Sequence, residues 1–185
     1  TAILAGDALT SLAFELVADG FEDAPLAGRI MAELAIATTD MIAGQVRDTL
    51  HDFEPDLEAP VDRVARIHRD KTAALIRCSC RMGGLCGGVD AAGLDALTAY
   101  GEAVGMMFQV VDDILDVTQT AEHLGKATGK DAEAGKLTYP EVIGLEASRA
   151  EVERLQSEAI EALAPLGEGA APLAELCELM AVRTR

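Results

Sequence analysis

Apolar residues recur every three or four positions along most of the chain, which is the spacing of one face of a helix. The pattern predicts six or seven helices and no confident strand. The main predicted helical segments are residues 3–20, 25–50, 60–82, 94–115, 141–163 and 172–182. Residues 51–60 are rich in proline and acids and residues 120–140 are rich in glycine, so both stretches are expected to be loops.

The composition agrees with an all-α fold. The chain has 185 residues, a length typical of one compact domain or most of one, and half of them are hydrophobic, which excludes a disordered linker. Strand-favouring residues are sparse, and aromatic residues make up only 3% of the chain. The four cysteines do not suggest a disulfide framework, so we expect a reducing, cytoplasmic location.

The charge balance argues against several classes of partner. Asp and Glu number 32 against 15 Lys and Arg, and the formal charge of -17 would repel nucleic acid and an anionic membrane surface. No apolar run reaches the roughly 18 residues of a membrane span. The chain opens inside an apolar-periodic segment, without a basic stretch typical of a secretory signal, as if cut from a longer chain.

The strongest chemical signal is a run of carboxylates in residues 108–116. On a helix with about 100° per residue, the three aspartates of this run fall within about 60° of Gln109. They are Asp112, Asp113 and Asp116. The opposite face carries Val110, Val111, Ile114, Leu115 and Val117. Neighbouring carboxylates raise one another's pKa unless a cation neutralises them, and Mg²⁺ is usually held by one or two carboxylates plus substrate phosphates. The run is therefore a candidate magnesium site.

Taken alone, the run is also explained by a solvated acidic face on an acidic protein, and that alternative stays open at this point. An EF-hand calcium loop does not fit, because the segment has no interior glycine and no glutamate at the position that ends such a loop. The choice depends on the residues that follow the run.

Three of the four lysines follow the run closely, and each comes directly after a glycine. They are Lys126, Lys130 and Lys136. Glycine lets the backbone approach an anion, and lysine is a point-charge partner for phosphate. A phosphorylated ligand bridged to the carboxylates by Mg²⁺ would explain both features, and we favour it over a solvated loop. A P-loop fits poorly, because Asp131 stands where that motif needs Ser or Thr.

The fourth lysine, Lys71, lies in the third predicted helix. Helical spacing places it on one face with His68 and Thr72, which is compatible with an anion contact, although a single helical lysine is usually solvated. In the preceding helix, Gln45 and Asp48 lie three residues apart on one face. This pair is better explained as a polar seam between helices.

Together these segments resemble the trans-type polyprenyl diphosphate synthases. Residues 108–116 resemble the second aspartate-rich motif of that family. Residues 124–131 and 135–140 resemble the segment that follows this motif in short-chain farnesyl and geranylgeranyl diphosphate synthases. Residues 44–48 and 68–73 match two further family segments in the expected order, so the resemblance covers essentially the whole chain.

The resemblance implies the isoprenoid synthase fold, an all-α antiparallel helix bundle around a deep central cavity. It makes residues 1–185 the C-terminal part of a single domain of this type, which would be N-terminally incomplete. In the family, two facing aspartate-rich helices hold Mg²⁺ ions against the diphosphate of an allylic substrate.

The resemblance also implies roles for individual residues. Asp112 would be the main Mg²⁺ ligand, and Asp113 and Asp116 would contact metal directly or through water. The allylic diphosphate would be held by Lys71, Lys126 and Lys136. Thr72 and Gln109 would line the reacting carbons, where their dipoles could stabilise the developing allylic cation.

The sequence also departs from the family pattern, since Asp-Asp occurs only once, at residues 112–113. The family's first aspartate-rich motif, its basic pocket for isopentenyl diphosphate and the residues that gauge product length precede the segment that matches Thr1. We therefore expect residues 1–185 alone to lack prenyltransferase activity. Apolar stripes without partners would also favour self-association.

The function implied by the resemblance is Mg²⁺-dependent prenyl transfer in a homodimer. The enzyme would condense isopentenyl diphosphate with an allylic prenyl diphosphate to make a longer trans-prenyl diphosphate of the farnesyl or geranylgeranyl class. Two alternatives stay open: a non-catalytic partner subunit of a full-length synthase, and a class I terpene synthase-like enzyme. The segment with Lys126, Lys130 and Lys136 and the Lys71–Thr72 pair both disfavour the terpene synthase alternative.

Overall fold

The computed structural model describes residues 1–50, 59–123 and 137–182, and every regular element in these ranges is a helix. The elements are α1 (Ala2–Gly20), α2 (Ala24–Thr49), α3 (Pro60–His68), the π-helical turn η1 (Arg69–Ala73), α4 (Ala74–Gly87), α5 (Ala91–His123), α6 (Tyr139–Ile143), α7 (Leu145–Ala162), the 3₁₀ segment η3 (Ala164–Ala170) and α8 (Ala171–Val182). The all-α prediction is confirmed. The two predicted loops lie mostly outside the described residues.

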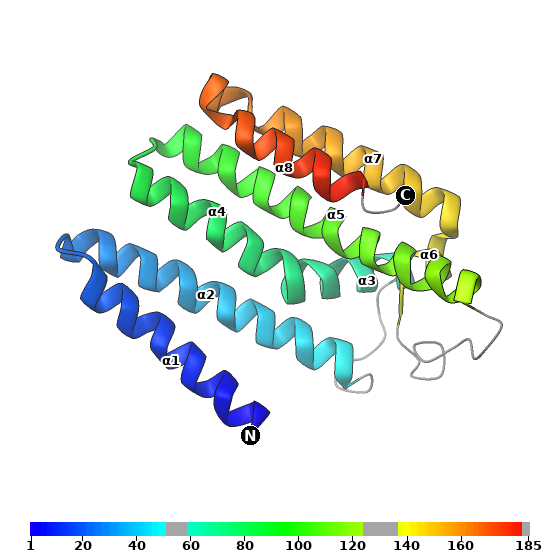
Figure 1. Ribbon diagram of the computed structural model, residues 1–185, viewed down its shortest axis with the longest axis horizontal. Coiled ribbons are helices and arrows are strands. Elements are labelled where there is room, and N and C mark those ends of the chain that lie inside the picture. The colour runs from blue at the N-terminus through cyan, green and yellow to red at the C-terminus, as the bar shows by residue number, and fades with distance from the viewer. Residues whose placement is uncertain (51–58, 124–136, 183–185) are drawn as a thin grey trace.

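The long helices lie side by side in the order α1, α2, α4 and α5, and α7 and α8 pack against the far side of α5 (Figure 1). Helix α5 is therefore the centre of the bundle, and the core gathers on it. Its fully buried side chains include Tyr100, Val104, Met107, Val110, Val111 and Ile114. The predicted apolar face of residues 110–117 is confirmed at Val110, Val111 and Ile114, whereas Val117 is exposed.

Local sequence signals explain several helix ends. The Asp23 side chain accepts a hydrogen bond from the backbone N–H of Leu26 at 3.0 Å, which caps α2, and Pro25 lies in the first turn of that helix. Gly88 ends α4 in the left-handed conformation, with φ of 69°. Gly144, with φ of 86°, separates α6 from α7, where the sequence pattern predicted one continuous helix.

Helix α1 packs only on α2 among the described elements (Figure 1). Its large aliphatic side chains are consequently exposed: Ile3, Leu4, Leu9, Leu12 and Leu16. None of the described helices combines the length and apolar character needed to cross a membrane.

A half-buried ion pair joins α2 to α4. Both carboxylate oxygens of Glu33 accept hydrogen bonds from the Arg81 guanidinium, from Nε at 2.7 Å and from Nη2 at 2.6 Å. This hydrogen bonding is the main reason that the pKa of Glu33 lies below its ordinary value. The paired carboxylate therefore stabilises the folded state at neutral pH.

The Glu33→Gln variant is expected to lose stability at pH 7 and to lose less on acidification than the unmodified protein. Because folding lowers the pKa of Glu33, its contribution is present above the ordinary carboxyl pKa and is lost as pH falls through the lower, folded-state value. Urea unfolding at several pH values between about 7 and 3 measures this, since carboxylates titrate in that window. Glu15→Gln, at an exposed position of α1, is the control. Parallel pH profiles for Glu33→Gln and the unmodified protein would contradict the prediction.

Candidate functional site

Two of the predicted site residues, Lys71 and Thr72, lie on η1, which contacts both α2 and α5. Two glycines allow this close packing. A Cβ atom on Gly44 of α2 would lie 2.3 Å from the Lys71 backbone nitrogen, and one on Gly105 of α5 would lie 2.5 Å from the Ala73 Cα. At the end of η1 the backbone N–H of Ala74 donates to the Arg69 carbonyl, the five-residue spacing of a π-helix. Such turns often mark functional sites.

Thr72 and Gln109, the two residues predicted to line the reacting carbons, lie in contact. The Thr72 hydroxyl donates a hydrogen bond to Gln109 Oε1 at 2.9 Å, and both side chains are half-buried. The bond joins η1 to α5 just before the aspartate run. Residues from the third and fourth predicted helices thus meet at one place.

Lys71 contacts α2 on the other side of the turn. Its Nζ lies 2.5 Å from Asp48 Oδ2, and the two side chains are 31% and 14% exposed respectively. This ion pair is the polar seam between helices that the sequence predicted for Asp48. Gln45 does not take part in it, since its amide nitrogen donates to Thr49 on the same helix at 2.8 Å.

His68 lies on a different face from Lys71, so the prediction of one shared face is wrong. His68 is buried, its ring is stacked on Tyr139 with centroids 5.4 Å apart, and its Nε2 lies 3.4 Å from Asp113 Oδ2. Lys71 points to α2 instead. The physical reason is the π turn, which changes the helical phase between the two residues.

The three aspartates of the carboxylate run lie in three environments. Asp116 is exposed, Asp112 is half-buried, and Asp113 is fully buried. The Asp113 carboxylate accepts a hydrogen bond from the Tyr139 backbone N–H at 3.0 Å. Helical phase explains the difference, because Asp113 lies nearest to the apolar face and α6 packs on that side. Asp113 thereby joins α5 to the start of α6.

A magnesium ion is compatible with the other two carboxylates. Asp112 and Asp116 lie about one helical turn apart, and oxygen ligands of this kind suit Mg²⁺, which takes its remaining ligands from phosphate and water. Within the described ranges, no three His, Cys, Asp or Glu side chains come together as a metal-binding group. The aspartates would therefore supply only part of a metal's coordination.

The predicted lysines Lys126, Lys130 and Lys136 lie outside the described residues. The described chain resumes at residue 137, and Tyr139 there is held by Asp113. Burial raises the pKa of the Tyr139 phenol to about 12, so the ring stays neutral at physiological pH. Asp113 thus holds the start of α6 against α5.

One pair of residues at the site was not predicted from the sequence. Arg47 Nη1 on α2 lies 2.6 Å from Asp70 Oδ2 on η1. Burial raises the pKa of the Asp70 carboxyl, although the Arg47 guanidinium acts in the opposite direction. The two residues are separated by 23 positions. No local sequence signal could have paired them.

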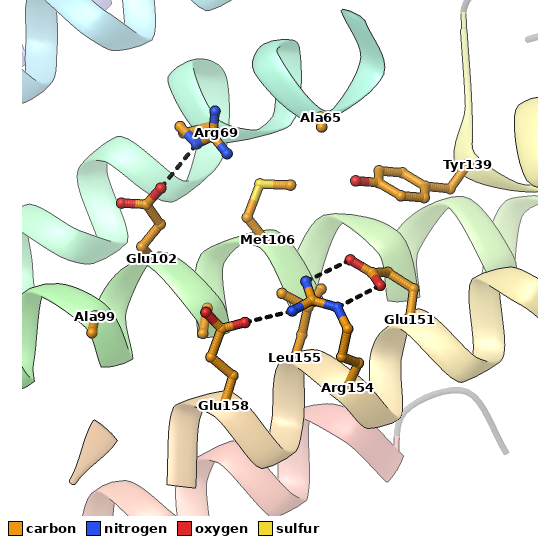
Figure 2. A pocket seen from close by; sticks show the side chains of 11 residues that line it. Ala65, Arg69, Ala99, Glu102, Met106, Tyr139, Glu151, Arg154, Leu155 and Glu158 are labelled. Carbon is orange, nitrogen blue, oxygen red and sulfur yellow. Dashed lines mark hydrogen bonds and ion pairs between the residues drawn. The ribbon is translucent and has the colours of Figure 1, made fainter. Parts of the chain in front are cut away.

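A separate hollow of about 370 Å³ lies over α5 between η1 and α7 (Figure 2). None of the predicted site residues lines it. Its charged side chains pair with one another: Arg69 with Glu102 at 2.9 Å, and Arg154 with Glu151 at 2.7 Å and with Glu158 at 2.8 Å. Because its three glutamates outnumber its two arginines, the hollow suits an anionic ligand poorly and is a weaker candidate than the surroundings of Lys71 and Thr72.

Comparison with known proteins gives a consistent result. Residues 1–165 match the family model described as polyprenyl synthetase. The chain is 44% identical to geranylgeranyl pyrophosphate synthase 11, chloroplastic, of Arabidopsis thaliana, across 98% of this chain and 53% of that protein. The chain therefore spans about half the length of the curated relatives it matches.

Solved structures share the fold. One is a geranyltransferase from Helicobacter pylori, complexed with magnesium and isoprenyl diphosphate, with a TM-score of 0.74 and 31% identity over 99% of this chain and 59% of that one. Another is an FPP/GFPP synthase from Zymomonas mobilis, with a TM-score of 0.80 and 29% identity over 97% of this chain and 60% of that one. The chain therefore shares the overall helix arrangement of these structures.

Proposed function

The chain belongs to the polyprenyl synthetase family, and we propose on this basis that the protein is a Mg²⁺-dependent trans-prenyltransferase. It would condense isopentenyl diphosphate with an allylic prenyl diphosphate to give a longer trans-prenyl diphosphate of the farnesyl or geranylgeranyl class. The names of the relatives, which are geranylgeranyl and related prenyl diphosphate synthases, support this assignment.

The observation that carries the proposal is the contact between Thr72 and Gln109 at 2.9 Å, with Lys71 on the same turn. Asp112 follows Gln109 by about one helical turn, so a cation, two neutral dipoles and a carboxylate are carried by η1 and the adjacent part of α5. This combination suits a substrate with an anionic leaving group and a carbon centre that becomes cationic. A solvated acidic face would not need these side chains to meet.

In the proposed reaction the bond between the allylic carbon and the diphosphate oxygen breaks, and the diphosphate leaves with the electron pair. The alkene of isopentenyl diphosphate forms a new bond to the allylic carbon, and a proton leaves to restore a double bond. Lys71 would hold the departing diphosphate through charge-assisted hydrogen bonds. The oxygen dipoles of Thr72 and Gln109 would face the positive charge as it develops.

The metal would be held mainly by Asp112, with Asp116 one turn further on. When bound, Mg²⁺ would neutralise charge on the diphosphate and so make it a better leaving group. Asp113 belongs to the predicted ligand set as well. Its hydrogen bond to the Tyr139 N–H supports a second role, which is to hold the start of α6 against α5.

The homodimer implied by the resemblance is also a proposal, and the exposed aliphatic face of α1 supports it. A cytoplasmic location stays a prediction. The plant relatives are named as chloroplastic proteins.

The proposed function is tested on the intact protein, as its own gene encodes it, with labelled isopentenyl diphosphate, an allylic diphosphate and Mg²⁺. We expect label to appear in an extractable, longer prenyl diphosphate. Consumption of the allylic diphosphate without isopentenyl diphosphate would instead indicate a terpene synthase. A partner subunit would show no prenyl transfer when assayed by itself, and it would change the turnover of a full-length synthase added to the assay.

Replacing Lys126 or Lys136 by alanine is expected to weaken binding of the allylic diphosphate about tenfold or more, because each change removes a charge-assisted contact to phosphate. The KM for the allylic substrate in the intact protein measures this. Arg149→Ala is a control that removes one positive charge from an exposed position of α7. An unchanged KM in both lysine variants would contradict the role of this segment.

A further inference from the structure

Three consecutive charged residues of η1 each form an ion pair with a flanking helix. Arg69 pairs with Glu102 of α5 at 2.9 Å, which Figure 2 shows at the edge of the hollow. Asp70 pairs with Arg47 of α2 at 2.6 Å. Lys71 pairs with Asp48 of α2 at 2.5 Å. The turn that carries Lys71 and Thr72 is thus held from both sides by charged contacts.

The two pairs on the α2 side have opposite polarity. Arg47 and Asp48 on α2 face Asp70 and Lys71 on η1, so each cation meets an anion only in this register. A shift of one residue along either helix would turn its side chains by about 100° and break both pairs. The two pairs together therefore specify the position of η1 along α2, in addition to attracting the two elements.

We propose that Arg47, Asp48 and Asp70 are positioning residues that fix η1 against α2 and so direct Lys71 and Thr72 toward the allylic diphosphate. This inference rests on the proposed function and assigns that function residues outside the predicted site. A lysine ammonium has three N–H donors, and Asp48 occupies one of them. Asp48 thus holds Lys71 in place and leaves donors for a phosphate.

The exposure of these pairs suggests that their main effect is on position. The Arg47 and Asp70 side chains are 22% and 24% exposed. Partly solvated ion pairs add little to the free energy of unfolding, because desolvation and side-chain entropy offset the attraction. A small displacement of a binding group, in contrast, changes the reaction rate strongly. The inference therefore predicts a larger loss in substrate handling than in stability.

The first experiment exchanges the charges of the Arg47–Asp70 pair in the intact protein. Arg47→Asp alone and Asp70→Arg alone each place like charges opposite one another. We expect each to raise the KM for the allylic diphosphate about tenfold, with little change in the KM for isopentenyl diphosphate. The double variant restores an attractive pair, and we expect its KM to return to within about threefold of the original. Failure of the double variant to recover would overturn the inference.

A matched control separates positioning from general stability. Glu33 and Arg81 form an ion pair between α2 and α4 at 2.6 Å, with side chains 21% and 22% exposed, so its burial resembles that of Arg47 and Asp70. Reversing one charge in this control pair should lower the unfolding temperature and leave the KM for the allylic diphosphate unchanged. An equal rise of that KM in the control variants would mean that any loosening of α2 suffices, and the positioning role would be wrong.

The second experiment is Asp48→Asn, which keeps the side-chain shape and removes one negative charge. By charge alone, this change would strengthen binding of an anionic ligand beside Lys71. If Asp48 positions Lys71, binding should weaken instead. Calorimetric titration with inorganic diphosphate and Mg²⁺ measures the affinity. Tighter or unchanged binding would show that Asp48 does not position Lys71.

A measurement without turnover keeps the inference separate from the proposed function. Amide hydrogen exchange of residues 69–73 reports how firmly η1 is held. We expect faster exchange in Asp70→Asn. This milder variant also tests the inference if the charge-reversed variants do not fold. If the unmodified protein makes no longer prenyl diphosphate, the proposed function is wrong whatever the exchange shows. Unchanged exchange in Asp70→Asn would show that the ion pairs do not fix η1 against α2, even if the enzyme is active.

Discussion

Replacing Asp112 by alanine is expected to lower the turnover number by about a thousandfold, the order of loss seen when a main electrostatic contact to the reacting charge is removed. Asp112 is the half-buried carboxylate of its run, and it lies one helical turn beyond Gln109, which contacts Thr72. The variant removes a proposed Mg²⁺ ligand but no core packing. Circular dichroism should therefore show the original helix content.

The measurement is prenyl transfer by the intact protein over a range of Mg²⁺ concentrations. Asp95→Ala is the control, since Asp95 is an exposed acid on the same helix α5, near its other end. We expect this control to keep nearly full turnover. Near-normal turnover of Asp112→Ala at saturating Mg²⁺ would refute the assignment of Asp112 as the main metal ligand.

The second large effect is expected from Gly44→Ala. The added Cβ would lie 2.3 Å from the backbone nitrogen of Lys71 and 2.8 Å from the carbonyl carbon of Asp70, so the backbone of η1 must move. Such overpacking costs about 1 to 3 kcal/mol of unfolding free energy. A displacement of η1 by about 1 Å would also lower kcat/KM for the allylic diphosphate by roughly a hundredfold.

The matched control for this change is Gly28→Ala on the same helix. Nothing lies within 4 Å of a Cβ added at Gly28, so the change should stabilise α2, because alanine favours a helix over glycine. Urea unfolding and steady-state kinetics of both variants provide the comparison. Full activity of Gly44→Ala would mean that the close approach of α2 to η1 has no part in substrate handling.

The helices could be predicted from the sequence because each buries one apolar stripe. The periodic residues of α5 illustrate this: Val110, Val111 and Ile114 follow helical spacing and are completely buried. Proline and glycine gave the approximate helix ends at Pro25, Pro60 and Gly20. Val117 has the right phase but is exposed, since a stripe predicts burial only where another element covers it.

The finer geometry of the site could not be predicted, because it depends on contacts between distant residues. Angular spacing places Asp113 on the same polar face as Asp112. Asp113 is nevertheless buried, because α6 packs beside it and the Tyr139 backbone N–H donates to its carboxylate. The π turn at η1 likewise lies where α2 and α5 approach closely, at Gly44 and Gly105. A regular helical period gives no sign of such a turn.

A candidate chemistry could be proposed from residue types alone. Acidic, amide, hydroxyl and lysine side chains stood at spacings that suggested a metal and a phosphorylated ligand. The contact of Thr72 with Gln109 is compatible with the prediction that both line the reacting carbons, and that role stays a prediction. The ion pairs of η1 could not be predicted, because this chain has many charged residues and the sequence alone does not show which of them pair.

The π turn at η1 has a consequence for how this segment can change in evolution. A π turn accommodates about one residue more than an α-helical turn of the same rise, so it acts as a one-residue insertion within a continuous helix. Deleting any single residue from 69–73 would let α3 and α4 continue as one regular helix. The flanking helices would keep nearly the same relative phase, but the side chains within the turn, Lys71 and Thr72 among them, would change direction. Exposed loops tolerate changes in length, but the length of this turn determines where its lysine points.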